Sequence, residues 1–284
     1  MNNASAHPSS SQATSNDATR GIVESFLDAR RNGRSLPDFP GEIPADLVSA
    51  YAVQDAAIAG WPDTVVGWKV GFIAPEKRDA SGDDRLLGPV FQGRLQQADA
   101  ATEFHIFDGG FGAIEAEYVL RLDADAPADK TEWTPDEAAA LASTLFIGME
   151  VASSPLATIN QLGPRVVVSD FGNNNGLVVG GEIADWTALD ETTLTAESWI
   201  DDTRVGTGGA TTLPGGLRTA IAFALGRSAR RGRPLKAGDL IATGNATGIH
   251  DILPGQRARV VFAGYGELVL TARAAAARTE EDAA

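Results

Sequence analysis

The feature that most constrains the fold is a succession of short β-rich runs that begins at Thr64. The runs are rich in β-branched and aromatic residues, and Gly, Pro or Asp separates many of them, as turns between strands require. In chain order they are TVVGWKVGFI, EAEYVLRL, LFIGMEVA, RVVVSDF, GLVVGGEI, DLIATG, RARVVFAG and ELVLTAR. These runs do not alternate regularly with helices. The pattern therefore predicts an α+β fold built on a mixed β-sandwich or roll and argues against a doubly wound sheet.

Helical signals precede and interrupt these strands. One helix is expected to begin near Asp17, because the apolar residues that follow recur on one helical face, and a second is expected after Pro44. Two more are expected within the β-rich region, one at the capping box that opens with Thr134 and one after Pro214. The predicted organisation is a disordered tail over 1–16, a helical N-terminal cap over 17–63, a β-rich catalytic domain over 64–273 and a C-terminal tail over 274–284.

Composition narrows the classes of partner and chemistry. The chain has 284 residues, 43% of them hydrophobic, which is enough for a sizeable core. Its formal net charge of −15 repels phosphate polymers, so no nucleic-acid partner is expected. The absence of cysteine excludes disulfides, thiolate metal sites and cysteine nucleophiles. No apolar run approaches the roughly 18 residues of a membrane span, so no membrane partner and a cytoplasmic location are expected.

The first candidate site is a pair of glutamates, Glu115 and Glu117, on one predicted strand. Strand alternation places both side chains on the same face, roughly 6 to 7 Å apart. Buried together, the two carboxylates would repel each other unless a cation lay between them or one held a proton. The alternative is a half-exposed strand with a hydrated acidic face.

Glu150 strengthens the metal interpretation, since it is the one charged residue in the apolar run LFIGMEVA. A buried unpaired carboxylate would cost several kcal/mol. Three carboxylates suit Mg²⁺ or Mn²⁺, which prefer oxygen ligands and leave positions for substrate and water. We therefore predict that Glu115, Glu117 and Glu150 hold such an ion. The alternative for Glu150 is a salt bridge to a distant arginine such as Arg165.

Lys69 is the second candidate, in the strand GWKVGF. Its side chain shares a strand face with Gly67 and Gly71, which leave room for a ligand carboxylate or enolate. A partly desolvated lysine there could stabilise a developing oxyanion or relay a proton. An edge lysine that discourages sheet aggregation is the alternative.

Two loops supply further candidates. Asp170 opens the polar loop DFGNNNG, where it could act as an acid or base or orient Lys69, although a purely structural turn is the simpler interpretation. In the loop ATGNATG, Thr243 and Gly244 could present hydroxyl and backbone N–H groups to a substrate carboxylate. His105 and His250 could lie near the site, but surface or core positions are the better expectation for both.

The order and spacing of these motifs resemble the fumarylacetoacetate hydrolase superfamily. GWKVGF, IEAEYVL, GMEVA, the loop from Asp170 to Gly176 followed by GLVVG, and ATGNATG with LPG carry the likeness. It is strongest to the branch of 2-keto-4-pentenoate hydratases and 2-oxo-acid decarboxylases. The resemblance implies that the three glutamates match the acidic metal ligands of the family and that Lys69 matches its active-site lysine. It also implies a mixed β-roll and a homo-oligomer. In the family this loop usually carries an Asp-Asn pair, whereas the sequence here from Asp170 is Asp-Phe-Gly-Asn, which departs from that pattern.

The resemblance also implies an activity. The leading hypothesis is a lyase that adds water to a 2-hydroxy-2,4-dienoate and gives a 4-hydroxy-2-oxo acid, with Mg²⁺ or Mn²⁺ as Lewis acid and Lys69 and Asp170 assisting proton transfer. Decarboxylation of a 2-oxo-diacid of the 4-oxalocrotonate type is the alternative, because both reactions pass through an enolate. Hydrolysis of a carbon–carbon bond in an acylpyruvate and a non-catalytic protein that binds small acids are the remaining alternatives.

Overall fold

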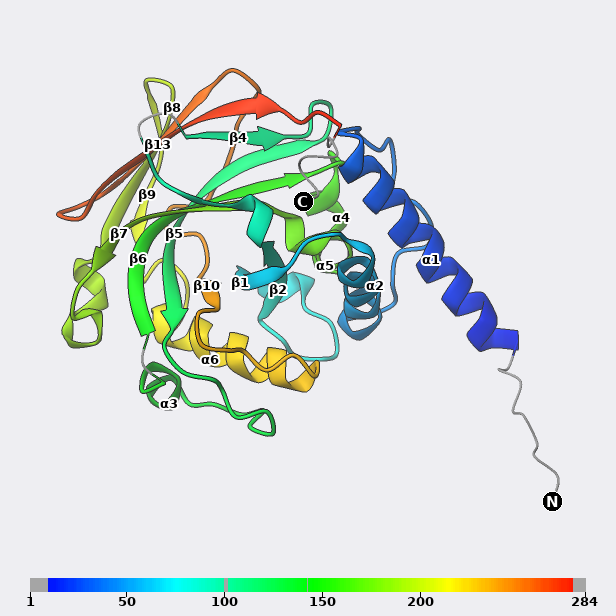
Figure 1. Cartoon of the computed structure of the whole chain (residues 1–284), viewed down its shortest axis with the longest axis horizontal. Coiled ribbons are helices and arrows are strands. Elements are labelled where there is room, and N and C mark those ends of the chain that lie inside the picture. The colour runs from blue at the N-terminus through cyan, green and yellow to red at the C-terminus, as the bar shows by residue number, and fades with distance from the viewer. Residues whose placement is uncertain (1–9, 100–101, 142, 278–284) are drawn as a thin grey trace.

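Two mixed β-sheets form the body of the molecule (Figure 1). Their strands come from sequence positions between Val65 and Ala274. The structure is a computed structural model that describes residues 10–99, 102–141 and 143–277. Within these residues the larger sheet has eight strands, in the order β2-β1-β10-β5-β6-β7-β3, with β11 pairing to β5. These strands are β1 (Val65–Phe72), β2 (Arg85–Phe91), β3 (Leu95–Gln97), β5 (Phe111–Leu122), β6 (Ser143–Ser154), β7 (Asn174–Ile183), β10 (Leu240–Ala242) and β11 (Ile249–Asp251).

The smaller sheet packs against the larger one. Its five described strands follow the order β4-β13-β12-β8-β9, and they are β4 (Glu103–Ile106), β8 (Thr195–Ile200), β9 (Thr203–Gly209), β12 (Arg257–Phe262) and β13 (Gly266–Ala274). The two sheets meet where Tyr118 of β5 contacts Phe262 of β12, with ring centroids 5.3 Å apart in an edge-to-face arrangement. Both side chains are buried, so this contact belongs to the main core. The predicted mixed α+β class is confirmed.

Helices flank the β1–β2 end of the larger sheet (Figure 1). They are α1 (Ser10–Arg31), α2 (Leu47–Gly60), α3 (Pro135–Ala139), α4 (Ile159–Leu162), α5 (Pro164–Ser169) and α6 (Gly216–Arg230). The predicted helix after Pro44 is α2, capped by the Asp46 side chain on the Ser49 N–H, and the capping box at Thr134 opens α3. No described helix combines the length and the apolar character of a membrane span.

The N-terminal helix begins earlier than the sequence indicates. Its apolar residues Ile22, Val23, Phe26 and Leu27 are buried on one face, as expected. The helix nevertheless starts at Ser10, so it extends into the range expected to be a tail. The rest of that range, residues 1–9, and most of the expected C-terminal tail, residues 278–284, lie outside the described residues.

One predicted strand is wrong. The run RVVVSDF forms α5 and a following 3-10 turn, η3 (Phe171–Asn173), although its valines favour strands. Pro164 occupies the first turn of α5, where its missing N–H costs nothing, and Val166 and Val168 are fully buried. The Gln54 side chain of α2 donates to the Val168 carbonyl at 3.0 Å. Tertiary burial thus overrides local strand preference in this segment.

Candidate metal centre

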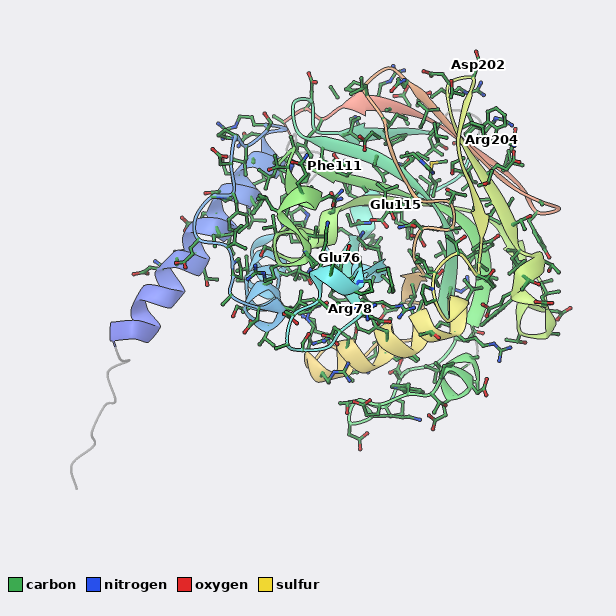
Figure 2. The ribbon with its side chains drawn as sticks, turned by 180° about the vertical axis from the view of Figure 1, so that it is seen from behind. Glu76, Arg78, Phe111, Glu115, Asp202 and Arg204 are labelled. Atoms are coloured by element: carbon green, nitrogen blue, oxygen red, sulfur yellow. The ribbon has the colours of Figure 1, made fainter. Side chains whose placement is uncertain are left out.

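Two neighbouring strands bring the three predicted glutamates together. Strands β5 and β6 are antiparallel, and Glu115 lies directly opposite Glu150 in their register. Glu117 follows two residues later on the same face of β5, opposite Gly148. One carboxylate oxygen from each glutamate lies within 4.8 Å of the others, and all three side chains are buried. Figure 2 shows Glu115 near the middle of the molecule, far from Asp202 and Arg204 at the β8–β9 hairpin.

Each of the three carboxylates keeps one oxygen without a hydrogen-bond partner. The oxygens are Glu115 Oε1, Glu117 Oε1 and Glu150 Oε2. Burial raises the pKa of Glu115 to about 7, with Lys69 opposing the shift, and burial together with the other carboxylates raises the pKa of Glu117 well above its usual range. Three buried oxygens that converge without partners fit a hard divalent cation, because carboxylate oxygens are the ligands that Mg²⁺ and Mn²⁺ prefer.

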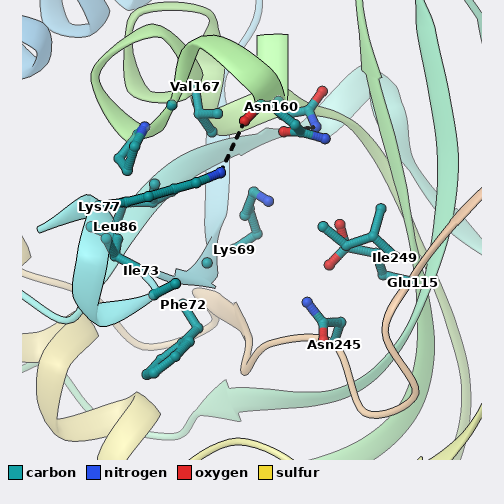
Figure 3. Close-up of a pocket in the computed structure, with 15 residues that line it drawn as sticks. Lys69, Phe72, Ile73, Lys77, Leu86, Glu115, Asn160, Val167, Asn245 and Ile249 are labelled. Atoms are coloured by element: carbon teal, nitrogen blue, oxygen red, sulfur yellow. Dashed lines mark hydrogen bonds between the residues drawn. The ribbon is translucent and has the colours of Figure 1, made fainter. Parts of the chain in front are cut away.

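The protein holds the second carboxylate oxygen of Glu117 and of Glu150. The backbone N–H of Gly244 donates to Glu117 Oε2 at 2.7 Å, and Asn174 Nδ2 donates to Glu150 Oε1 at 3.1 Å. The Asn245 side chain lies beside Glu115 at the pocket and acts to lower its pKa (Figure 3). Glu117 and Glu150 are therefore each fixed through one oxygen while the other remains free to bind an ion.

Lys69 projects from β1 to the edge of this cluster. Its Nζ lies 3.3 Å from Glu150 Oε1, and the side chain is only 6% exposed. Burial alone would lower the pKa of Lys69, but attraction to the three glutamates outweighs burial, so the pKa is raised and the ammonium stays charged. A Cβ on Gly71 would lie 3.0 Å from Leu86 Cδ1 and 3.8 Å from this Nζ, so the glycine avoids crowding beside the lysine. Gly67 instead allows β1 to pack closely against β10, since a Cβ there would lie 2.5 Å from the Leu240 carbonyl oxygen.

A pocket of about 190 Å³ opens beside Lys69 and Glu115. Asn245 completes its polar end, and apolar side chains that include Phe72 and Val167 line much of the remainder (Figure 3). One member of the glutamate cluster and a buried ammonium therefore lie in a pocket whose lining is mostly apolar. Such a site suits a small acid whose polar end reaches the cluster and whose carbon chain lies along the apolar lining.

Solved structures with a similar architecture include two complexes of one decarboxylase and a hydrolase, while no family model matches the chain. The 4-oxalocrotonate decarboxylase from Pseudomonas putida G7, complexed with calcium and acetate, superposes with a TM-score of 0.74 at 21% identity. Its complex with magnesium and adipate gives a TM-score of 0.75 at 20% identity, and both alignments cover 90% of this chain and 98% of the other. The chain has the fold of the fumarylacetoacetate hydrolase superfamily. Fumarylpyruvate hydrolase from Pseudomonas aeruginosa, in complex with Mn²⁺ and pyruvate, matches with a TM-score of 0.53 at 14% identity, over 73% of this chain and 89% of that one.

In this fumarylacetoacetate hydrolase-type fold, the hydrogen-bond partners of Asp170 are Arg30 and Ser154 rather than Lys69. Arg30 of α1 donates from Nε to Asp170 Oδ1 at 2.5 Å, and Ser154 Oγ donates to Oδ2 at 2.6 Å. Asp170 is 1% exposed and does not line the pocket. Both carboxylate oxygens are thus engaged by structural partners, while Lys69 pairs with Glu150. The catalytic role predicted for Asp170 remains a prediction, and its surroundings favour the structural alternative.

The loop after β10 also differs from the expected arrangement. Thr243 Oγ1 donates to the Tyr118 carbonyl at 2.8 Å, and the Gly244 N–H is used by Glu117. Neither residue lines the pocket beside Lys69, whereas the next residue, Asn245, does. The substrate contacts predicted for Thr243 and Gly244 remain predictions, and the structure gives Gly244 a part in holding the acidic cluster.

Two further expectations can be compared with the structure. Arg165 donates to the Pro44 and Ala45 carbonyls at 2.9 and 2.8 Å, so the alternative in which Glu150 pairs with Arg165 is wrong, and Lys69 is its ion-pair partner. Neither His105 nor His250 lines the pocket. Sequence reasoning missed Asn174 and Asn245 because an amide in a polar loop gives no signal of its own, although both lie in the two loops that the sequence singled out.

Proposed function

We propose that this chain is a Mg²⁺- or Mn²⁺-dependent enzyme that acts on a small 2-oxo acid, with Glu115, Glu117 and Glu150 as the metal ligands. The observation that carries the proposal is the set of three buried carboxylate oxygens without partners, all within reach of one ion. The adjoining pocket with Lys69 at its polar end supports an enzyme rather than a protein with a purely structural ion. The similar structures contain calcium, magnesium or manganese together with acetate, adipate or pyruvate, which agrees with this assignment.

Within this class we favour decarboxylation of a 2-oxo-diacid over hydration of a 2-hydroxy-2,4-dienoate. The superpositions on 4-oxalocrotonate decarboxylase extend over 90% of the chain, compared with 73% for the fumarylpyruvate hydrolase. Hydration also needs a base that activates water, and Asp170, the residue predicted to assist, is held by Arg30 and Ser154. Decarboxylation needs no such base. Hydrolysis of a carbon–carbon bond is disfavoured for the same reason, because neither His105 nor His250 lines the pocket.

The residues of the pocket suit this reaction. Loss of CO₂ breaks the bond between the leaving carboxylate carbon and its neighbour, and the electron pair moves through the conjugated chain to the oxygen at position 2. One proton is then taken up at that oxygen to give the 2-hydroxy-diene. A divalent cation, when bound, would supply Lewis-acid stabilisation at this end of the pocket. We assign to Lys69 the stabilisation of the developing negative charge and the delivery of the proton.

The test is turnover with both substrate types. Purified protein with Mg²⁺ or Mn²⁺ is incubated with 4-oxalocrotonate and, separately, with 2-hydroxypenta-2,4-dienoate, and the products are followed by NMR together with CO₂ release. We expect CO₂ from the diacid and no hydration of the dienoate. A 4-hydroxy-2-oxo acid formed from the dienoate would instead support the hydratase hypothesis.

Variants connect the activity to the site. Glu115→Gln is expected to lower metal-dependent turnover by more than roughly 100-fold, and Lys69→Ala by roughly 10²- to 10⁴-fold. Glu182→Gln is the matched control, because Glu182 is an exposed glutamate on β7 of the same sheet. Turnover that survives Glu115→Gln, Lys69→Ala and EDTA would reject the proposal, and metal-dependent binding of small acids without turnover of either substrate would favour the non-catalytic alternative.

A further inference from the structure

A second lysine, Lys77, lines the same pocket as Lys69 and Glu115. It ends η1 (Pro75–Lys77), a single 3-10 turn that follows β1. The turn is fixed by the Lys77 N–H, which donates to the Ala74 carbonyl at 2.9 Å, and by Arg78 Nε, which donates to the Ile73 carbonyl at 3.0 Å. In Figure 3 the Lys77 side chain reaches across the pocket wall, and Lys69 lies between it and Glu115. The pocket thus has a second cationic position, beyond Lys69 from the cluster.

The charge on Lys77 is not neutralised by the protein. Its Nζ donates to the Asn160 carbonyl oxygen at 3.4 Å, which is at the long end of a hydrogen bond. No carboxylate in the described part of the chain forms an ion pair with it. The chain's three other lysines do have such partners: Lys69 pairs with Glu150, Lys130 with Glu137, and Lys236 with Asp125. The Lys77 ammonium at the pocket therefore has N–H groups available to bind a ligand.

The lining of this pocket is mostly apolar. Phe72, Leu86 and Val167 contribute side chains to it. The pocket of about 190 Å³ is smaller than the roughly 300 to 1,000 Å³ of sites for drug-sized ligands, so it favours a short molecule. Two ammonium groups that line one small, mostly apolar pocket are complementary to a short linear chain with a carboxylate at each end.

We propose that Lys77 binds the second carboxylate of a linear 2-oxo-dicarboxylate whose 2-oxo acid end lies at Lys69 and the glutamate cluster. The inference rests on the proposed function and deepens it by assigning the residue that selects a diacid over a monoacid. A carboxylate held by Lys77 would gain a charge-assisted hydrogen bond that a methyl group at the same position cannot make. Specificity of this kind is a difference between two affinities, so it can be measured by binding as well as by turnover.

The binding test uses two acids of equal chain length, adipate and hexanoate, titrated calorimetrically into the Mg²⁺-loaded full chain. The wild-type protein is expected to bind adipate roughly tenfold more tightly than hexanoate, as one hydrogen bond to a charged group allows. Lys77→Met is expected to abolish this preference and to change hexanoate affinity less than twofold. Lys77→Arg, which keeps the charge, is expected to retain part of it.

Lys236→Met is the matched control, since it removes the same charge from an exposed lysine paired with Asp125 away from the pocket. It is expected to leave both affinities unchanged, and an unchanged melting temperature will show that Lys77→Met folds normally. A tenfold preference for adipate that survives Lys77→Met overturns the inference while leaving the proposed function standing. If neither acid binds in an Mg²⁺-dependent way, the proposed function fails and the inference fails with it.

Kinetics provide a second readout. If the carboxylate at Lys77 is the one that departs, its charge is lost as CO₂ forms, so the contact stabilises the bound substrate more than the transition state. Lys77→Met should then raise KM for the diacid about tenfold while kcat is unchanged or higher. A fall in kcat without a rise in KM would contradict a binding role for Lys77.

Discussion

At the scale of single residues, Glu117 shows the cost of burying three neighbouring carboxylates without a cation: its charged form is destabilised by burial and by repulsion from the other two. Its side chain has no exposed surface, Oε1 has no partner, and burial and the neighbouring carboxylates raise its pKa well above the usual range. Glu117→Gln keeps an oxygen for the Gly244 N–H and removes a negative charge from the cluster. We expect this variant to raise the free energy of unfolding of the metal-free protein by roughly 1–3 kcal/mol.

Urea unfolding in EDTA at pH 8 measures this effect. Glu182→Gln, an exposed change of the same kind, should alter the free energy of unfolding by no more than about 0.5 kcal/mol. The same Glu117 variant should lose most of the stabilisation that Mg²⁺ gives to the wild-type protein. A metal-free Glu117→Gln protein that is less stable than the wild type would contradict the description of the cluster as an unsatisfied anionic site.

Arg30 and Asp170 form a buried ion pair whose loss should lower the stability of the protein. Their side chains are 4% and 1% exposed, and the pair connects α1 to the loop that carries Asn174. Arg30→Met leaves Asp170 buried without its counter-ion, so we expect a loss of roughly 3–5 kcal/mol in the free energy of unfolding. Adding Asp170→Asn should recover part of that loss, which a double-mutant cycle by urea unfolding would detect. Strict additivity of the two changes would show that the pair is not coupled.

At the residue scale, strand alternation sets how much of the candidate site's geometry the sequence can predict, while the roles of these residues remain predictions. Glu115 and Glu117 were placed on one face from their two-residue spacing, and Glu150 was singled out because a charge in an apolar run needs a partner. The positions of Asn245 and Lys77 follow from loop and turn geometry, which has no comparable period. Asp170 shows the limit clearly, since its partner Arg30 lies 140 residues away in the sequence.

At the scale of secondary-structure elements, α3 depends on a capping box that carries a titratable group. The Glu137 side chain accepts the Thr134 N–H at 2.9 Å and also contacts Lys130. The Thr134 N–H first, and then the Lys130 ammonium, lower the pKa of Glu137 from 4.5 to about 2. Because the folded pKa is depressed, the stabilisation is complete above the unfolded value of 4.5 and is lost as pH falls towards 2.

A carbon-13 NMR titration of the Glu137 carboxyl group tests this expectation. Its midpoint should lie well below 4.5, and Glu137→Gln should make the amide signals of α3 less sensitive to pH between 4.5 and 2. A midpoint near 4.5 would show that the capping box is not formed in solution.

Elements were predictable where the hydrophobic pattern was long and continuous. The runs EAEYVLRL and LFIGMEVA predict strands, and the structure extends each of them to the 12 residues of β5 and β6, whereas Gly88 and Pro89 interrupt the pattern of β2, which the sequence does not predict. Pro89 is tolerated because β2 lies at the edge of the larger sheet. At α5 the sequence instead predicts a strand that does not exist. The β-branched valines favour a strand, and tertiary packing makes a helix there.

At the scale of the whole molecule, a strongly acidic chain concentrates three of its carboxylates in its interior. The formal net charge is −15, so any added cation will screen repulsion on the surface, whereas only a site-bound ion relieves the buried cluster. The homo-oligomer implied by the family resemblance remains a prediction that sedimentation can test. Assembly also makes stability depend on protein concentration, so thermal comparisons must hold that concentration fixed.

Specific metal binding should therefore appear as a thermal shift that ionic strength cannot reproduce. A ligand present at 100 times its dissociation constant adds roughly 2.7 kcal/mol to the free energy of unfolding, and each kcal/mol raises the melting temperature of a chain of this size by roughly 2–4 °C. We expect Mg²⁺ or Mn²⁺ to raise the melting temperature by roughly 5–10 °C relative to EDTA, as measured by differential scanning calorimetry. NaCl at matched ionic strength should produce a much smaller shift, and Glu117→Gln should abolish most of the metal effect. An equal rise with NaCl would mean that Mg²⁺ acts only by screening the acidic surface, and the three buried glutamates would then need another explanation.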